Sequence, residues 1–189
     1  LVDQGLRSLT NFALAIFLIK LTTKTEYGYY ALAYPIVLFL ISLQNAAVSS
    51  PLKVLLAAKR SRERRRYVRA LCWGQLVALA PAAALVLAAA AVMALIGASG
   101  PPVTIAPALA GSALGILLFE FLRVYYFAEE RPGTVLKADL VHVALFGGLL
   151  LTAVATGALS AGVALLANGL AAAIVFGLYR RRALSPCWT

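Results

Sequence analysis

The sequence predicts an all-α, polytopic membrane protein with about six transmembrane helices in one bundle. Apolar residues make up 62% of its 189 residues and charged residues only 13%, and its mean hydropathy is +0.90. A soluble domain is nearer half apolar and a quarter charged. No charged residue lies between Arg69 and Glu120, and a gap of that length can hold two spans of about 20 residues each. Because hydrocarbon offers backbone groups no partners, helices are expected to fill such gaps.

Six apolar segments each end at a polar or turn-forming stretch, and we expect them to form a single six-helix lobe over residues 1–189. Pro35 and Pro51 in the second segment predict kinks. The third segment ends at Gly97–Pro102, a run of helix-breaking residues. The stretches 22–26, 128–137 and 156–160 are predicted to be turns or loops. The predicted spans are residues 4–21, 27–57, 70–96, 103–127, 138–155 and 161–179.

The most basic stretch, Lys59–Arg69, lies between the second and third predicted spans and is predicted to be a loop. It reads KRSRERRRYVR. If this loop is cytoplasmic, the alternation of six spans puts both termini on the same side. All of the 17 Lys and Arg residues except Lys20 and Lys24 then lie inside. The positive-inside rule therefore predicts a multi-pass protein of the inner (plasma) membrane with both termini cytoplasmic.

The same charge pattern bears on the partners of the chain. The basic residues are confined to segments that flank the apolar spans. We therefore expect Lys59–Arg69 to attract anionic membrane lipids, and we expect no nucleic-acid binding.

The two cysteines predict neither a disulfide nor a metal site. Cys72 and Cys187 are far apart and belong to no CxxC motif or Cys/His cluster. We interpret Cys72 as a core residue, and no metal or other cofactor is predicted. The chain shows no cleavable signal peptide and begins at Leu1 rather than at Met, so we expect a few residues to precede it.

Charged residues within the predicted spans are spaced as pairs on one helix face. The pairs are Asp3 and Arg7, Glu120 and Arg123, and Asp139 and His142. Such residues are costly inside a membrane and usually face a cavity or a partner. In the predicted orientation they all lie in the cytoplasmic half, which predicts a water-filled cavity opening inward. Each pair also has a structural interpretation, as an interfacial pair, as an ion pair that locks two helices together, or, for the histidine, as a packing residue.

Two further patterns indicate helix packing or ligand binding. The second span carries Ser42, Asn45, Ser49 and Lys53 at spacings that place them on one polar face. This stripe could line the cavity or hydrogen-bond between helices. Gly111 and Gly115 form a GxxxG pattern, which we interpret as close helix packing rather than dimerisation.

An enzyme is not expected. The run Gly97–Gly100 matches a motif of rhomboid-type intramembrane serine proteases. His142, the only histidine, is predicted at the opposite membrane face, whereas a nucleophile and its base must lie within hydrogen-bond reach. Glu129 and Glu130 precede Arg-Pro-Gly and are predicted to lie in a solvated turn rather than in a paired-carboxylate site.

Three regions of the chain carry a family resemblance. The first is Val2–Phe12 running to Thr25–Ala33, the second is Leu43–Leu52, and the third is Phe119–Ala128 followed by Arg131-Pro132 and Ala138–Leu140. They resemble the first hairpin, the second helix, and the connection from the fourth to the fifth helix of lipid-linked polysaccharide flippases of the O-antigen or capsule type. These flippases belong to the multidrug/oligosaccharidyl-lipid/polysaccharide exporter superfamily.

The resemblance implies a transporter of two six-helix lobes around a central cavity. Its cargo would be a polyprenyl-pyrophosphate-linked oligosaccharide, moved to the outer leaflet for cell-surface polysaccharide biosynthesis. The chain matches the amino-terminal lobe only. A second six-helix lobe, from a carboxy-terminal half or from a second copy, is therefore an expected partner.

A pyrophosphate headgroup calls for cationic donors in a cavity of low dielectric constant. We expect Arg7, Lys53 and Arg123 to bind it, with Asn45 and Ser49 as neutral donors. The expected supporting or ion-coupling residues are Asp3, Glu120, Asp139 and His142. Two alternatives stay open: a cation-coupled multidrug exporter lobe of the same superfamily, and a non-transporting scaffold in a polysaccharide assembly complex.

Overall fold

The computed structural model describes residues 2–58, 61–96 and 101–184, and apart from short turns these residues are helical, which confirms the all-α prediction for this part of the chain. The elements are α1 (Val2–Leu21), α2 (Lys24–Gln44), the π-helical turn η1 (Asn45–Ser49), α3 (Ser50–Ala58), α4 (Ser61–Leu95), α5 (Pro101–Ala128), α6 (Pro132–Ala155) and α7 (Ala161–Leu184). Within these residues, four stretches are long and apolar enough to cross a membrane: Lys24–Val54, Ile105–Ala128, Pro132–Ala155 and Ala161–Arg180.

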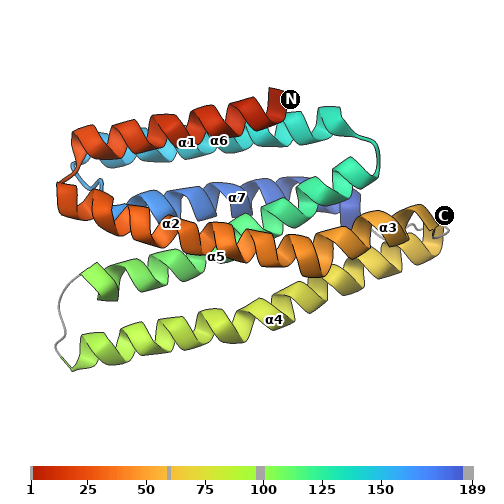
Figure 1. The fold of residues 1–189 in the computed structure, drawn as a ribbon, viewed down its shortest axis with the longest axis horizontal. Coiled ribbons are helices and arrows are strands. Elements are labelled where there is room, and N and C mark those ends of the chain that lie inside the picture. Colours follow the sequence, from red (N-terminus) through yellow and green to blue (C-terminus); the bar gives the residue numbers. More distant parts are fainter. Residues whose placement is uncertain (1, 59–60, 97–100, 185–189) are drawn as a thin grey trace.

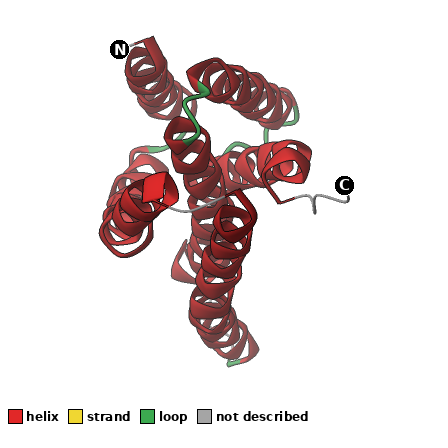
Figure 2. Ribbon diagram, turned by 90° about the vertical axis from the view of Figure 1, so that its right-hand side faces the viewer, coloured by secondary structure: helices red, strands yellow, loops and turns green. Residues whose placement is uncertain are grey.

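The helices lie roughly along one long axis and alternate in direction (Figure 1). α5 is the central helix: its longest contact is with α7, and it also packs against α2, α3, α4 and α6. α1 packs against α2 and α6, whereas α4 packs mainly against α5. Figure 2 looks along the bundle and shows the described residues as helices joined by short loops. Side chains of α5 therefore meet most of the other elements.

Large apolar side chains are exposed along the outside of the helices. Leu32, Phe39, Leu151 and Leu178 each expose more than half of their surface. A soluble monomer rarely exposes apolar patches of this extent. Together with the four candidate spans, this exterior is consistent with a multi-pass membrane protein.

The backbones of α5 and α7 approach each other closely at two glycines, Gly115 and Gly169. A Cβ atom on Gly115 would lie 2.8 Å from the carbonyl carbon of Gly169 and closer still to its oxygen. A Cβ on Gly169 would lie 3.0 Å from the carbonyl oxygen of Gly111. The interpretation of Gly111 and Gly115 as a close-packing pattern is therefore confirmed, with α7 as the partner.

The basic stretch is not the loop that the sequence suggested. Residues 61–69 form the first turns of α4, a helix of 35 residues that runs on into the apolar segment. Lys59 and Arg60 lie outside the described residues. Arg and Glu are good helix formers, and the stretch contains neither Gly nor Pro, so nothing in it stops the helix. Glu63 in the first turn also suits the positive end of the helix dipole.

The connection between α5 and α6 is shorter than the predicted loop at residues 128–137. α5 continues to Ala128, and α6 already begins at Pro132, because proline fits the first turn of a helix. The turn at residues 156–160 is confirmed, and its Gly157 lies in the left-handed region at φ +68°. The amides of Gly157 and Ala158 bond back to Val154 and Ala153, which closes the end of α6.

Cys72 is buried and free, as expected for a core residue. It packs in a cluster with Leu52, Val68, Phe121 and Phe176. This cluster joins α3, α4, α5 and α7. Cys187 lies outside the described residues.

Glu26 links the turn after α1 to the start of α7. The Thr23 hydroxyl accepts a hydrogen bond from the Glu26 amide at 3.2 Å and so caps α2. The Glu26 carboxylate accepts a hydrogen bond of 2.8 Å from the amide of Ala161, the first residue of α7. A carboxylate there satisfies an otherwise orphan N–H and opposes the positive end of the helix dipole.

Glu26→Ala should lower the free energy of unfolding by about 1–2 kcal/mol, because a cap to a buried amide is lost. Glu26→Gln keeps an acceptor oxygen and should cost less. Glu63→Ala, at an exposed acidic residue in the first turn of α4, is the matched control and should change stability by no more than about 0.5 kcal/mol. Thermal unfolding of the purified variants in detergent measures all three. If Glu26→Ala and Glu63→Ala lowered the free energy of unfolding equally, the hydrogen bond from Ala161 to Glu26 would not stabilise the protein.

Candidate functional site

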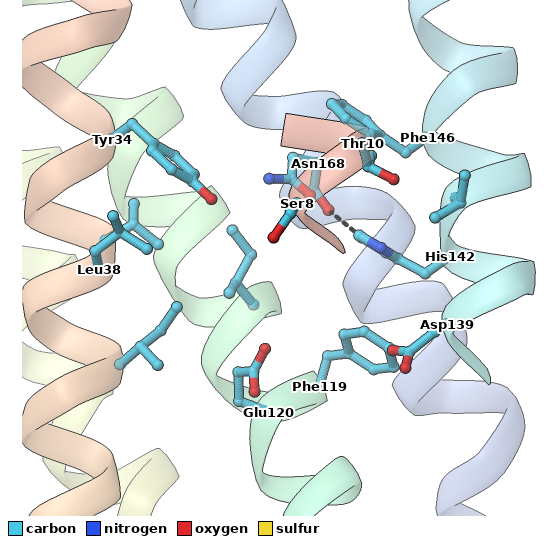
Figure 3. A pocket seen from close by; sticks show the side chains of 14 residues that line it. Ser8, Thr10, Tyr34, Leu38, Phe119, Glu120, Asp139, His142, Phe146 and Asn168 are labelled. Atoms are coloured by element: carbon cyan, nitrogen blue, oxygen red, sulfur yellow. Dashed lines mark hydrogen bonds between the residues drawn. The ribbon is translucent and has the colours of Figure 1, made fainter. Parts of the chain in front are cut away.

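A polar cavity of about 240 Å³ lies between α1, α2, α5, α6 and α7. Apolar side chains form much of its wall, but each of the five helices adds at least one polar group. These are Ser8, Thr10, Tyr34, Glu120, Asp139, His142 and Asn168. Figure 3 shows the Tyr34 hydroxyl and the Glu120 carboxylate directed into the space between the helices. Polar groups from segments far apart in the sequence therefore meet at one place in the bundle.

Arg123 holds the two acidic residues of the cavity in place. Its Nη1 donates a hydrogen bond of 2.9 Å to Glu120 Oε2, one turn away on α5, and its Nε lies 2.9 Å from Asp139 Oδ1 on α6. All three side chains are at least nine-tenths buried. The guanidinium also lies 6.0 Å from the centre of the Phe127 ring. The described contacts of Arg123 therefore join α5 to α6, and Arg123 itself does not line the cavity.

His142 is part of a stack of rings on one wall of the cavity. Its ring centroid lies 5.0 Å from that of Phe119 and 6.2 Å from that of Phe146. Its Nε2 lies 3.5 Å from the backbone oxygen of Asn168 on α7 (Figure 3). The packing interpretation of this histidine thus has direct support, while one edge of the ring still lines the cavity.

The structure brings four of the predicted site residues together. Glu120, Arg123, Asp139 and His142 lie on facing turns of α5 and α6, and the predicted same-face spacing of both pairs is confirmed. The side chains of Asp3, Arg7 and Asn11 lie outside the described residues. Ser8 and Thr10 nevertheless place α1 at the cavity.

The prediction that Ser42, Asn45, Ser49 and Lys53 form one polar face of the second span is wrong. Asn45 and Lys53 are exposed, as is Ser42, whereas Ser49 is buried. The reason is η1, in which the Ser50 amide bonds five residues back to the Asn45 carbonyl. The wider turn adds a residue and rotates all later positions of the span relative to ideal helical spacing. It also relieves Pro51, whose ring would clash with a carbonyl one normal turn earlier.

Sequence reasoning passed over the polar residues that α2 turns inward. Gln44, not Asn45, is buried, and its Nε2 donates to Gln75 Oε1 at 3.1 Å and to the Leu117 carbonyl at 2.8 Å. This contact joins α2, α4 and α5. Tyr34 and Asn168, which line the cavity, were also missed. Each of these residues is an uncharged polar residue inside a long apolar segment. That pattern favours a hydrogen bond between helices, and it could have identified them from the sequence.

In its described residues the protein is an all-helical bundle that has several candidate membrane-spanning helices and a cavity with polar groups between them. Comparison with protein-family models, with curated proteins and with solved structures gave no match to the chain. The family resemblance of the sequence therefore stays a prediction.

Proposed function

We propose that this chain is the amino-terminal, six-helix lobe of a membrane transporter that moves a lipid-linked oligosaccharide across the bilayer. The observation that carries the proposal is the cavity of about 240 Å³, lined by polar groups from five helices in a bundle with an apolar exterior. Polar groups inside a membrane bundle typically mark a substrate or ion pathway. A purely structural bundle gains nothing from leaving such a space unfilled.

The proposed topology has six crossings, with α1 and α4 added to the four candidate spans. The start of α4, the turn between α5 and α6, and the end of α7 lie at one end of the bundle (Figure 1). Arg64 and Glu129 form an ion pair of 3.2 Å at that end. By the positive-inside rule this end and both termini face the cytoplasm of a plasma membrane. The basic start of α4 would then lie against anionic lipid headgroups.

The cargo is inferred from the resemblance, which implies a polyprenyl-pyrophosphate-linked oligosaccharide for cell-surface polysaccharide such as lipopolysaccharide or capsule. A second six-helix lobe would complete the pathway around the cavity. Three of the residues that were expected to bind the pyrophosphate headgroup lie in positions less suited to that role. Arg123 forms ion pairs with two carboxylates, and Asn45 and Lys53 are exposed. These positions support a stabilising role for Arg123 more than direct pyrophosphate binding.

Asn168→Ala should lower the rate of lipid-linked oligosaccharide translocation by about two- to tenfold, the effect of losing one hydrogen bond to the cargo. The measurement uses proteoliposomes that contain the full-length protein and its lipid-linked substrate. Asn45→Ala removes the same amide from an exposed position and should leave the rate unchanged. Equal rates for both variants, at equal protein levels, would contradict a transport role for the cavity. No translocation by the unmodified protein would favour the scaffold.

A cation-coupled drug exporter is the second candidate, because two carboxylates line the cavity while Arg123 does not. The same proteoliposomes distinguish the two functions. Efflux of ethidium that depends on Asn168, without translocation of lipid-linked oligosaccharide, would favour the exporter.

A further inference from the structure

We propose that the π-helical turn η1 is a register switch, which lets α3 rotate by one residue position, about 100°, relative to α2. In the second register the span is α-helical throughout, and Val48 takes the buried place that Ser49 has in this structure. The switch is independent of the cargo and concerns how the second span moves.

Ser50 stabilises the wide turn. Its amide and its hydroxyl both donate to the Asn45 carbonyl five residues earlier, the hydroxyl at 2.9 Å. In a regular α-helix the amide bonds to the carbonyl four residues earlier, and a serine hydroxyl reaches the carbonyl three or four residues earlier. Both bonds to Asn45 therefore belong to the wide turn and are lost in the second register.

Burial favours the second register. Ser49 is only 2% exposed, and its hydroxyl has no hydrogen-bond partner among the described residues. A buried polar group without a partner costs free energy. Val48, one residue earlier, is half-buried and packs against the apolar cluster that contains Leu52. Rotation by one position therefore exchanges an unpaired hydroxyl in the core for an apolar side chain.

Pro51 favours the wide turn without requiring it. In a regular α-helix its ring would clash with the Ala47 carbonyl, and rotation would also put Pro51 in the place of Leu52. However, Pro35 and Pro81 both lie inside α-helices of this same chain. Membrane helices accommodate proline with a kink. The wide turn is therefore a preference of this segment, and the burial of Val48 opposes it.

The position of η1 determines which part of the bundle the switch moves. On one side of it, Val37 and Ile41 of α2 line the cavity. On the other side, Leu52 of α3 is fully buried in one cluster with Val68 and Cys72 of α4. Rotation would remove Leu52 from this cluster. The contact between α3 and α4 would loosen, while the part of α2 at the cavity stays in place.

The test is the rate at which a water-soluble maleimide labels Ser49→Cys and Val48→Cys. Both are made in the full-length protein with Cys187→Ser and placed in lipid nanodiscs, and the same protein without the new cysteine gives the blank, because Cys72 is buried. The helical chain from Lys24 to Ser49 is longer than about 30 Å of hydrocarbon, so this level of the span reaches water.

Pro51→Ala should shift the protein to the second register, because alanine is the best residue inside an α-helix and proline the worst. Labelling of Ser49→Cys should then rise about tenfold or more, while labelling of Val48→Cys should fall. Opposite changes at adjacent residues identify a rotation. Ser50→Ala removes the hydroxyl bond to Asn45 and should shift both rates in the same directions.

Two control variants separate rotation from other effects. Pro35→Ala, at an exposed proline within α2 and away from the turn, should leave both labelling rates unchanged. Deletion of Ala47, an exposed residue of the turn, removes the extra residue. Combined with Pro51→Ala, it gives an α-helix in which Ser49 keeps its buried place. Labelling of Ser49→Cys should then stay as low as in the protein with the unmodified turn.

Three results would overturn the switch. The first is unchanged labelling of Ser49→Cys in Pro51→Ala. The second is a rise at both positions together, which would mean local unfolding. The third is a rise at position 49 that persists when Ala47 is deleted. If Pro51→Ala does not fold, Ser50→Ala takes its place in each comparison. The labelling needs no transport substrate, so its outcome is separate from that of the translocation measurement.

Discussion

Gly115→Ala is expected to lower the free energy of unfolding by about 3 kcal/mol or more, at the upper end of the usual effect of overpacking. The added methyl would lie 2.8 Å from the carbonyl carbon of Gly169 and closer to its oxygen. Both neighbours are backbone atoms, so no side chain can rotate away. α5 and α7 must therefore separate along their longest contact. Thermal or denaturant unfolding in detergent micelles measures the loss.

Two other glycines provide matched controls. A methyl on Gly111 would meet only a Leu166 side-chain carbon at 3.4 Å, and one on Gly177 would meet nothing within 4 Å. Gly111→Ala should therefore be nearly neutral. Gly177→Ala should be neutral or stabilising by up to about 1 kcal/mol, because alanine is the better helix former. If Gly115→Ala is as stable as Gly111→Ala, the two helices do not cross at this glycine.

The Gly111 and Gly115 spacing predicted that two helices pack closely, but not which helix is the partner. Gly169 lies seven residues after Gly162 and eight before Gly177, so it forms no GxxxG pattern with another glycine. Which helix meets which depends on the whole bundle, and single-helix patterns contain no information about that choice. The same limit applied to Arg123: its i,i+3 partner Glu120 was evident from the sequence, whereas its contact with Asp139 on α6 depended on the packing of two helices.

The register of the second span was the main failure of sequence reasoning. Ideal helical spacing put Asn45 and Lys53 on one face with Ser49, but η1 inserts a wider turn between residues 45 and 49. Helical periodicity assumes 3.6 residues per turn, so one π-helical turn changes every later position. Pro51 predicted a kink, but not that the turn before it would widen. The buried Gln44 is the residue that the ideal spacing missed.

The cavity was predicted from its charged residues, and its neutral residues were missed. Charges in an apolar segment are rare and therefore conspicuous, which is why Glu120, Asp139 and His142 were selected. Tyr34 and Ser8 are ordinary members of membrane helices, and only their positions around the cavity give them a role. The neutral hydrogen-bonding groups of the cavity could therefore be recognised only from the fold.

Arg123→Ala is expected to be the most destabilising charge substitution in the described part of the chain, with a loss of about 3–5 kcal/mol. The arginine forms a hydrogen-bonded ion pair with Glu120 and an ion pair with Asp139, and all three side chains are nine-tenths buried or more. Its removal takes the shared cation from two buried carboxylates at once. Arg123→Lys should recover only part of the loss, because one ammonium cannot reproduce the two directed contacts of a guanidinium.

The triple variant Glu120→Gln, Arg123→Met, Asp139→Asn separates charge from packing. It removes the cation and both anions together, and replacing a whole buried network by neutral groups is often nearly neutral for stability. We therefore expect it to unfold closer to the unmodified protein than Arg123→Ala does. Arg64→Ala breaks the partly exposed pair with Glu129 and should cost no more than about 1 kcal/mol. Unfolding in detergent measures the stability of all of these variants.

A triple variant less stable than Arg123→Ala would mean that the network contributes net stability. In that case the three residues would act as a clamp between α5 and α6 that also keeps the two carboxylates at the cavity.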